Sequence, residues 1–213
     1  FICLEMSKKI LVTGGSGMLG MALKEIMPEA NYVSSKDYNL KSQADVNDMF
    51  DFFRPDLVVH LAAVVSGIQD NIKRPYSHFT DNVLMNTCMV DAAMEYGVER
   101  FIGMLSTCAY PDRASHFPIT EDMLHESAPT PTNFGYGISK RMMATQIDTC
   151  NKQYGTKYQY MIPANIYGNH DKWEDNRSHY VAALIKKIHY AKINNEKSIR
   201  LMGSGTPVRQ FVN

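Results

Sequence analysis

The feature that most constrains this sequence is a glycine-rich stretch close to its start. A short apolar run at Lys9–Val12 leads into Thr13-Gly-Gly-Ser-Gly-Met-Leu-Gly20, and residues 21–27 have the composition of a helix. A strand, a glycine turn and a helix N-terminus together form an anion site, because glycines let the backbone approach a pyrophosphate and free amides point at it. The glycines fit both the GxGxxG and the GxxGxxG spacing. The stretch therefore predicts a dinucleotide-binding turn.

The pattern of a strand followed by a helix repeats along the chain. Further strands are predicted at 31–36, 57–63, 100–106, 157–162 and 198–202, and further helices at 46–53, 76–96, 136–154 and 181–193. The run Leu57–Ala63 is almost continuously apolar, which is typical of a strand buried on both faces of a parallel sheet. Alternating strands and helices predict an α/β fold with a doubly wound parallel sheet of the Rossmann type.

This pattern also suggests how the chain is divided. We expect a Rossmann domain that binds the dinucleotide over residues 6–168, and the start of a truncated substrate-binding region over residues 169–213. Phe1–Glu5 precede Met6-Ser-Lys-Lys, which looks like a natural start. We therefore expect these five residues to be an artificial extension.

The end of the second predicted strand bears on the choice of dinucleotide. In a Rossmann fold this strand ends beside the adenosine ribose, where an acidic residue favours NAD. Here the strand ends in Ser34, Ser35 and Lys36, and hydroxyls with a cation suit the 2′-phosphate of NADP. Asp37 lies one residue further on and leaves NAD open as the alternative. The sequence favours NADP(H).

A tyrosine and a lysine are spaced by one helical turn at the start of the helix predicted at 136–154. Tyr136 and Lys140 are four residues apart, so their side chains share one face of the helix. A nearby ammonium favours phenolate, and we expect it to bring the pKa of Tyr136 from about 10 toward neutrality. Tyr136 is then a candidate general acid or base.

Other polar residues follow the fourth predicted strand. That strand ends in Ser106-Thr-Cys108-Ala-Tyr-Pro111, and ligands of open α/β sheets bind beyond the carboxyl ends of the strands. We therefore expect Ser106 and Cys108 to face the same crevice as the glycine turn. His60, inside the third predicted strand, is interpreted as a core histidine.

Composition excludes several classes of protein. The 22 Lys and Arg residues balance 22 Asp and Glu residues, so there is no basic excess for nucleic acid. The four cysteines show no metal-binding spacing, which indicates free thiols in a reducing compartment and no metal site. No apolar run of about 18 residues suits a membrane, and no signal peptide is evident. We expect a cytoplasmic protein.

Taken together, the glycine turn, Ser106, Tyr136 and Lys140 resemble the extended short-chain dehydrogenase/reductase superfamily, and the resemblance spans residue 6 to residue 213. Further motifs resemble the GDP-L-fucose synthase family, whose members are GDP-4-keto-6-deoxymannose 3,5-epimerase/4-reductases. These motifs are Ser-Thr-Cys-Ala-Tyr-Pro, Pro163-x-Asn165-x-Tyr167-Gly168, Arg177-Ser-His179 and Gly203-Ser-Gly-Thr-Pro-Val-Arg209. The related 4,6-dehydratases carry Asp-Glu where Cys108 and Ala109 stand, which argues against dehydration.

The resemblance implies a role for each matching residue. Cys108 is the expected base and His179 the expected acid of epimerisation, Tyr136 the proton donor of reduction, Ser106 a partner of the carbonyl, and Lys140 a partner of Tyr136 and of the nicotinamide ribose. Substrate contacts are expected from Asn165, Lys187 and Arg209, which would meet a GDP-sugar. Cofactor contacts are expected from Gly14, Gly15, Ser16, Gly17, Met18, Leu19, Gly20, Lys36, Ala62, Ala63, Leu105, Lys140, Pro163, Asn165 and Ile166.

Two departures from the family pattern concern binding. Ser16 stands where many relatives have an arginine that grips phosphate, and Met202 stands where some have tryptophan. Two alternatives to an epimerase/reductase stay open. One is a C4 reductase of another GDP-4-keto-6-deoxy sugar, such as a heptose, and the other is a non-catalytic NADP-binding subunit.

The resemblance also implies a homodimer. In this superfamily the helices that correspond to 76–96 and 135–153 pair across a two-fold axis as a four-helix bundle. We expect Cys88 and Met89, or Met142 and Met143, to pack at that interface.

Overall fold

The structure, a computed structural model, describes residues 8–174, 178–201, 203–206 and 208–213. Phe1–Glu5, Arg177 and Met202, which were named above, lie outside the described residues.

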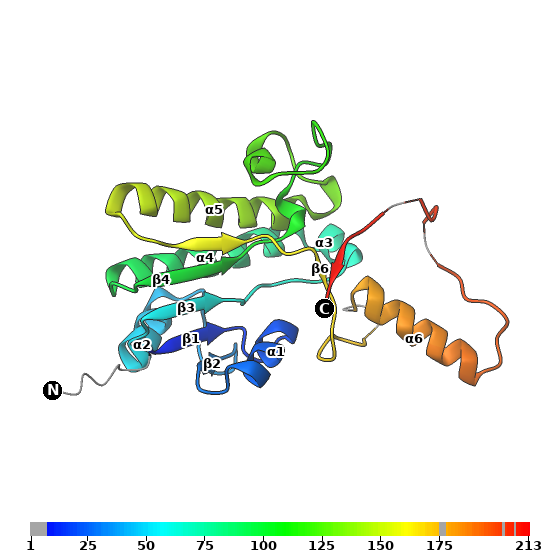
Figure 1. Cartoon of the computed structure of the whole chain (residues 1–213), viewed down its shortest axis with the longest axis horizontal. Helices are drawn as coiled ribbons and strands as arrows, with labels where there is room; N and C mark the ends of the chain where they lie inside the picture. Colours follow the sequence, from blue (N-terminus) through cyan, green and yellow to red (C-terminus); the bar gives the residue numbers. More distant parts are fainter. Residues whose placement is uncertain (1–7, 175–177, 202, 207) are drawn as a thin grey trace.

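Five parallel strands form the central sheet, and Figure 1 shows them one below another, from β5 at the top to β2 at the bottom. Their order is β2-β1-β3-β4-β5, and their bounds are Asn31–Val33, Ile10–Thr13, Leu57–His60, Arg100–Met104 and Gln159–Met161. The chain leaves β1 toward β2 on one side and returns to β3 on the other. The predicted doubly wound parallel sheet is confirmed, and its switch point lies between β1 and β3, where such folds bind ligands.

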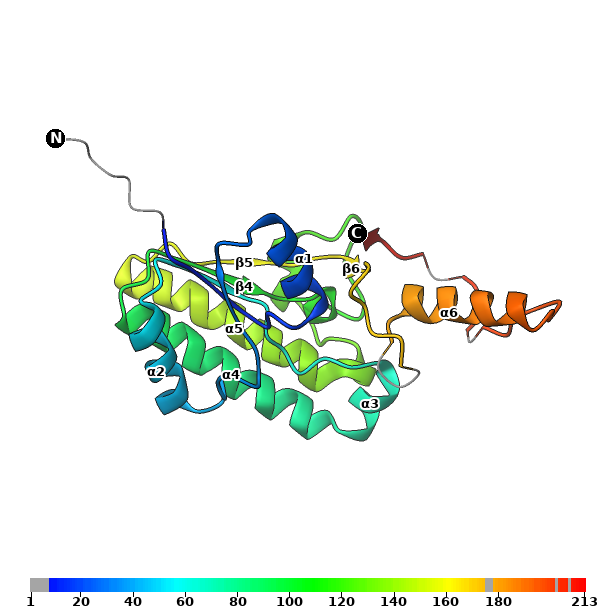
Figure 2. The same cartoon turned by 90° about the horizontal axis from the view of Figure 1, so that it is seen from below.

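Helices cover both faces of this sheet. In Figure 2, α1 (Met18–Ile26) lies on one face, and α2 (Gln43–Phe53), α4 (Pro75–Glu95) and α5 (Phe134–Tyr154) lie on the other. This division follows from right-handed crossovers, because the β1-to-β2 connection runs in the opposite direction to the later ones. Phe50, Met89, Phe101 and Ile147 are fully buried between the three helices and the sheet.

Local signals set the ends of these helices. Ser42 caps α2 by accepting a hydrogen bond from the Asp45 amide, and α5 ends at Gly155, whose φ of 71° is left-handed. The strands are shorter than predicted, because hydrogen bonding between neighbouring strands stops where each strand continues into a loop at the carboxyl edge of the sheet. Ala62, Ala63 and Ser106, for example, lie in loops beyond β3 and β4.

Shorter elements surround the carboxyl edge. They are α3 (Ile68–Lys73), the 3₁₀ turns η1 (Thr107–Ala109), η2 (Glu121–His125) and η3 (Pro131–Asn133), and the two-stranded parallel sheet of β6 (Asn165–Ile166) and β7 (Phe211–Val212). The prediction of a strand at 198–202 was wrong for its described part, since residues 198–201 have no regular structure.

The last part of the chain extends from the main body. Helix α6 (Tyr180–Ile193) begins near β6 and runs away from the sheet, as Figure 1 shows in orange. The chain then returns so that β7 pairs with β6. Asn165 and Ile166, which we assigned to the first domain, thus pair with residues of the second, and a boundary at residue 168 stays a prediction.

In the described segments, no helix combines the length and the apolar character that crossing a membrane requires.

Candidate active site

The glycine turn between β1 and α1 is tightly packed against its neighbours. Gly14 has a φ of 74°, and a Cβ added to it would lie 2.8 Å from the Ala62 nitrogen. A Cβ on Gly20 would lie 2.4 Å from the Gly14 carbonyl oxygen. Helix α1 has no side-chain cap at Gly17, so its first amides are left to a ligand or solvent. This geometry fits a dinucleotide phosphate.

The residues at the tip of β2 distinguish between the two candidate dinucleotides, NADP and NAD. Asp37 Oδ2 accepts hydrogen bonds from the Ser34 amide at 2.7 Å and from the Ser34 hydroxyl at 2.8 Å. These bonds lower the pKa of Asp37. The carboxylate is thus already hydrogen-bonded within its own turn. Lys36 is exposed beside it. The arrangement therefore favours NADP, whose 2′-phosphate suits Lys36, over NAD, whose ribose hydroxyls would need a free carboxylate.

The structure brings Ser106, Cys108 and Tyr136 together beyond the end of β4. Tyr136 is buried, and the Ser106 side chain and the Cys108 thiol lie near enough to its phenol to shift the phenol pKa. The Cys108 amide donates to Ser106 Oγ at 3.2 Å, which fixes η1. A Cβ on Gly137 would lie 2.4 Å from the Cys108 carbonyl oxygen, so this close approach requires glycine there.

Lys140 lies beneath Tyr136 in the same buried site. Its ammonium is 5.7 Å from the centre of the Tyr136 ring and donates to the Met104 carbonyl oxygen at 2.7 Å. Burial lowers the pKa of Lys140 to about 8.

The expected direction of the Tyr136 pKa shift was wrong for this structure. Burial raises the pKa of the Tyr136 phenol, and the neighbouring Cys108 raises it further, while the Ser106 hydrogen bond acts in the opposite direction. Desolvation of the phenolate is the largest of these influences on the Tyr136 pKa. Tyr136 keeps its proton at neutral pH and is a proton donor before it can be a base.

His179 stands outside this group, at the start of α6. Its side chain is 42% exposed, and Nδ1 lies 3.1 Å from Oδ1 of Asp171, whose side chain is only 3% exposed. Asp171 follows His170, which contacts Glu25 of α1 at 2.7 Å. Asp171 thus holds the His179 ring from a segment anchored to the Rossmann domain.

The predicted substrate residues lie on three segments. Asn165 donates through Nδ2 to the Gln210 carbonyl oxygen at 2.9 Å, which brings the exposed Arg209 close to β6. Lys187, on α6, donates to the Arg200 carbonyl oxygen at 3.3 Å. The structure therefore associates Asn165 with Arg209, whereas Lys187 belongs to a separate contact.

The remaining predicted cofactor residues fall into two groups. Ala62, Ala63, Pro163 and Ile166 are half-buried in segments that leave the carboxyl edge of the sheet. Leu105 is 2% exposed, and its side chain belongs to the core, so only its backbone could meet a ligand.

His60 is the core histidine that the sequence suggested. It is buried, and its ring contacts Thr13 Oγ1 at 2.7 Å and Asn86 Oδ1 at 3.1 Å. Burial, followed by the charge of Lys140, lowers its pKa to about 3, so the ring is neutral. The sequence analysis missed its partner Asn86, together with His78 and Asn82. Their spacing of four residues within an otherwise apolar helix face was the available signal.

A hollow in the surface lies apart from the group of Ser106, Cys108, Tyr136 and Lys140. It has a volume of about 710 Å³ and lies between α6 and residues 171–174, with Trp173, Ile185 and Tyr190 among its lining residues. The residues that line it do not include Ser106, Cys108, Tyr136 or Lys140. The volume of this hollow therefore does not identify it as the reaction site.

Comparison with known proteins fits this geometry. Residues 10–213 match the model of the NAD dependent epimerase/dehydratase family, and the chain belongs to this family. The fold is that of the extended short-chain dehydrogenases/reductases. Within the family, the resemblance to GDP-L-fucose synthases is confirmed by several relatives.

A GDP-L-fucose synthase from Dictyostelium discoideum is 35% identical over 212 residues, which are 96% of this chain and 66% of the relative. A probable GDP-L-fucose synthase from Drosophila melanogaster is 35% identical over 96% of this chain and 68% of its own length. The crystal structure of a GDP-L-fucose synthetase from Naegleria fowleri bound to NADP superposes with a TM-score of 0.86 at 34% identity, covering 98% of this chain and 70% of that one. The chain thus spans about two thirds of the length of the curated relatives it matches.

Substitution at Gly14 tests the fit of the glycine turn. We expect Gly14→Ala to destabilise the fold by about 2–4 kcal/mol, through left-handed strain of about 1 kcal/mol and overpacking against Ala62 of about 1–3 kcal/mol. We also expect it to weaken NADP⁺ binding at least about tenfold. The control is Gly97→Ala, because Gly97 also has a positive φ of 66° but nothing within 4 Å. Equal losses of stability and affinity in both variants would contradict the close-packing account.

The lowered pKa of Lys140 predicts a pH dependence of stability. The folded chain releases this proton near pH 8, whereas the unfolded chain keeps it to about pH 10.5, so raising the pH between these values favours folding. Relative to Lys140→Met, the unmodified chain should gain up to about 3 kcal/mol of unfolding free energy across this window. Urea unfolding of both proteins at pH 7.5 and pH 10 measures the gain. Parallel pH profiles would show that the Lys140 ammonium is not desolvated.

Proposed function

We propose that this chain carries an NADPH-dependent nucleotide-sugar epimerase/reductase that converts GDP-4-keto-6-deoxymannose to GDP-L-fucose. The observation that carries the proposal is the assembly of Ser106, Cys108, Tyr136 and Lys140 at the carboxyl edge of the sheet that also carries the glycine turn. The names of the relatives and the NADP bound to the Naegleria structure support the choice of reaction and cofactor.

Binding divides among the segments described above. The glycine turn would hold the pyrophosphate, and Lys36 would meet the 2′-phosphate, since Asp37 is committed to Ser34. Asn165 and Arg209 would contact the GDP-sugar, in which Arg209 suits a diphosphate oxygen. Lys187 would pair with the same diphosphate or its ribose from α6.

Reduction at carbon 4 relies on the buried group. NADPH, when bound, supplies the hydride. Tyr136 donates its proton to the alkoxide oxygen that develops at carbon 4, and its raised pKa means that this proton is present at neutral pH. Ser106 holds the same oxygen by a hydrogen bond. Lys140, with a pKa of about 8, is mostly protonated at pH 7 and stabilises the phenolate that Tyr136 leaves behind.

Epimerisation requires a base and an acid on opposite faces of the sugar. Cys108 would remove the protons next to the keto group, a task suited to a polarizable thiolate held close to the carbonyl that Ser106 binds. His179 would return protons from the other face, with its ring oriented by Asp171. The keto group stabilises each enolate that forms.

Separate variants distinguish these steps. Tyr136→Phe should reduce NADPH oxidation with GDP-4-keto-6-deoxymannose by about 10²–10⁴-fold, because it removes the proton donor. Cys108→Ser should abolish deuterium uptake from D₂O at the carbons next to the keto group, while it leaves NADP⁺ affinity unchanged. Stopped-flow absorbance and NMR measure the two steps.

Three other outcomes would each favour a different account. Reduction without deuterium uptake in the unmodified chain would favour a simple C4 reductase of this or another keto sugar. NADPH binding without turnover would favour a non-catalytic subunit. Full NADPH oxidation by Tyr136→Phe would remove Tyr136 from the mechanism.

We further propose that the chain acts in the cytoplasm and forms a homodimer through α4 and α5. A groove of about 330 Å³ runs between these helices, and Leu84 and Met142 are 45% and 43% exposed. Of the two pairs expected at the interface, Cys88 and Met89 are buried in the chain's own core, whereas Met142 and Met143 line this groove.

Charge placed on the exposed surface of α4 and α5 tests the dimer. Native mass spectrometry should show a dimer for the unmodified chain and a monomer for the double variant Leu84→Glu, Met142→Glu, because two like charges would meet their copies across the two-fold axis. Ile188→Glu, on the exposed face of α6, is the control and should stay dimeric. A monomer in the unmodified chain would contradict the proposal.

A further inference from the structure

Helix α4 carries a stripe of buried polar side chains that the reaction does not use. His78, Asn82 and Asn86 follow one another at intervals of four residues, so they share one face, and none is more than 1% exposed. Buried polar groups are costly unless they are hydrogen-bonded, so the partners of this stripe indicate its purpose. Outside α4 itself, the partners are His60 of β3, Val64 in the loop that follows β3, and Asp70 of α3.

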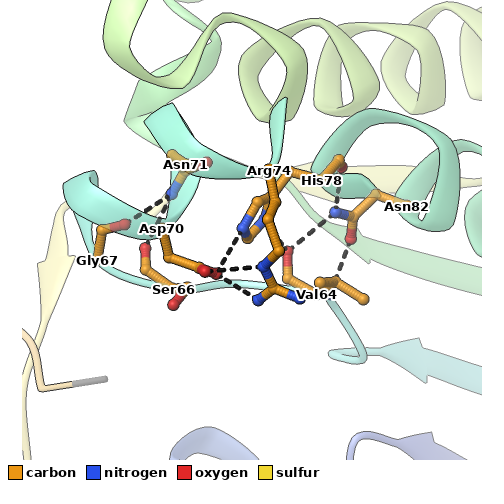
Figure 3. A network of polar contacts seen from close by, with 8 residues as sticks. All are labelled: Val64, Ser66, Gly67, Asp70, Asn71, Arg74, His78 and Asn82. Atoms are coloured by element: carbon orange, nitrogen blue, oxygen red, sulfur yellow. Dashed lines mark hydrogen bonds and ion pairs between the residues drawn. The ribbon is translucent and has the colours of Figure 1, made fainter. Parts of the chain in front are cut away.

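Asn82 holds the middle of that loop. Its Oδ1 accepts from the Val64 amide at 2.9 Å, and its Nδ2 donates to the Val64 carbonyl oxygen at 2.9 Å, as Figure 3 shows. One side chain thus satisfies both backbone groups of a loop residue, in the way a neighbouring strand would. The Asn82 side chain therefore substitutes for sheet pairing where β3 has ended.

His78 and α3 extend this support. The His78 ring contacts the Val64 carbonyl oxygen at 3.3 Å and Asp70 Oδ2 at 2.9 Å, and Asp70 also binds Arg74 through two hydrogen bonds of 2.8 and 2.6 Å. Asn71 of α3 donates to the carbonyl oxygens of Ser66 and Gly67 at 3.0 and 3.2 Å.

Asn86 acts at the start of the loop. It contacts His60 at 3.1 Å, and His60 contacts the Thr13 hydroxyl, which accepts from the Ala62 amide at 3.4 Å. The loop is therefore anchored at about every second residue from Ala62 to Gly67. Its first residue lies against the glycine turn, because a Cβ on Gly14 would nearly touch the Ala62 nitrogen.

We propose that Asn82 and His78 are positioning residues of the dinucleotide site. By fixing the backbone of residues 62–66, they hold the wall of the site that faces the glycine turn. The inference rests on the proposed function, since it assigns these residues to the same site. It predicts that loss of the Asn82 contacts weakens dinucleotide binding beyond any loss caused by instability.

The chain offers a matched control in Asn151. Its Oδ1 accepts from the Tyr158 amide at 2.9 Å, and its Nδ2 donates to the Tyr158 carbonyl oxygen at 2.8 Å. Tyr158 precedes β5 and so lies at the amino edge of the sheet, opposite the site. Asn82→Leu and Asn151→Leu thus remove the same pair of bonds from opposite edges.

The test measures NADP⁺ affinity by calorimetry and unfolding midpoints in urea for both variants. Asn82→Leu should raise the Kd for NADP⁺ at least tenfold and Asn151→Leu less than twofold, although both lower the midpoint. Asn82→Asp, which keeps the shape but sets a carboxylate against the Val64 carbonyl oxygen, should also raise the Kd and guards against misfolding of Asn82→Leu. An equal change in Kd for Asn82→Leu and Asn151→Leu, or no change in either, would overturn the inference.

Amide exchange in the free chain separates this inference from the proposed function. Exchange at the Val64 amide should accelerate at least tenfold in Asn82→Leu and stay unchanged in Asn151→Leu, where the Tyr158 amide should accelerate instead. Unchanged exchange at Val64 would overturn the positioning role. Failure of the unmodified chain to bind NADP⁺, with this exchange pattern intact, would contradict the proposed function and leave the loop anchoring supported.

Discussion

The rest of the structure depends on the close approach of the β1 turn to the end of β3. Gly14 leaves no room for a side chain beside the Ala62 amide, and the Leu61 amide donates to the Thr13 carbonyl oxygen at 3.3 Å. This approach occurs at the switch point, where the connections from neighbouring strands diverge and leave the carboxyl edge uncovered. The phosphate turn, the loop of residues 62–67 and the end of β4 are therefore parts of one surface, on which a cofactor and a reacting group can meet.

Helix α5 places polar and charged side chains at that surface, and burying them costs desolvation free energy. Tyr136, Lys140 and Arg141 are all buried near its start, and each pKa moves in the direction that disfavours charge. Backbone carbonyl groups offset part of this cost, since Lys140 donates to Met104 and Arg141 to Ala109. The two bonds also tie α5 to the segments on either side of Ser106 and Cys108. The buried Lys140 and Arg141 side chains thus help to hold Ser106 and Cys108 beside the start of α5.

Much of this could be predicted from the sequence, for reasons of covalent geometry and spacing. The glycine turn, the parallel sheet and the grouping of Ser106 with Tyr136 follow from patterns that act locally or through strand order. The direction of the Tyr136 pKa shift could not be predicted, because it depends on how deeply the ring is buried. Nor could the anchoring of the loop by Asn82, since the four-residue spacing of His78, Asn82 and Asn86 marks a polar face of α4 but does not show which backbone groups it meets. Residues 198–201 have strand composition but no neighbouring strand to pair with, so composition misled there.

Amide chemical shifts during titration of the ¹⁵N-labelled chain with NADP⁺ test the central claim most directly, namely that the carboxyl edge of the sheet is one dinucleotide site. The account predicts shifts at residues 14–20, 62–66 and 106–108, with Val98 and Tyr158 at the amino edge unchanged. Shifts confined to α6 and residues 171–174, or no shifts at all, would contradict it.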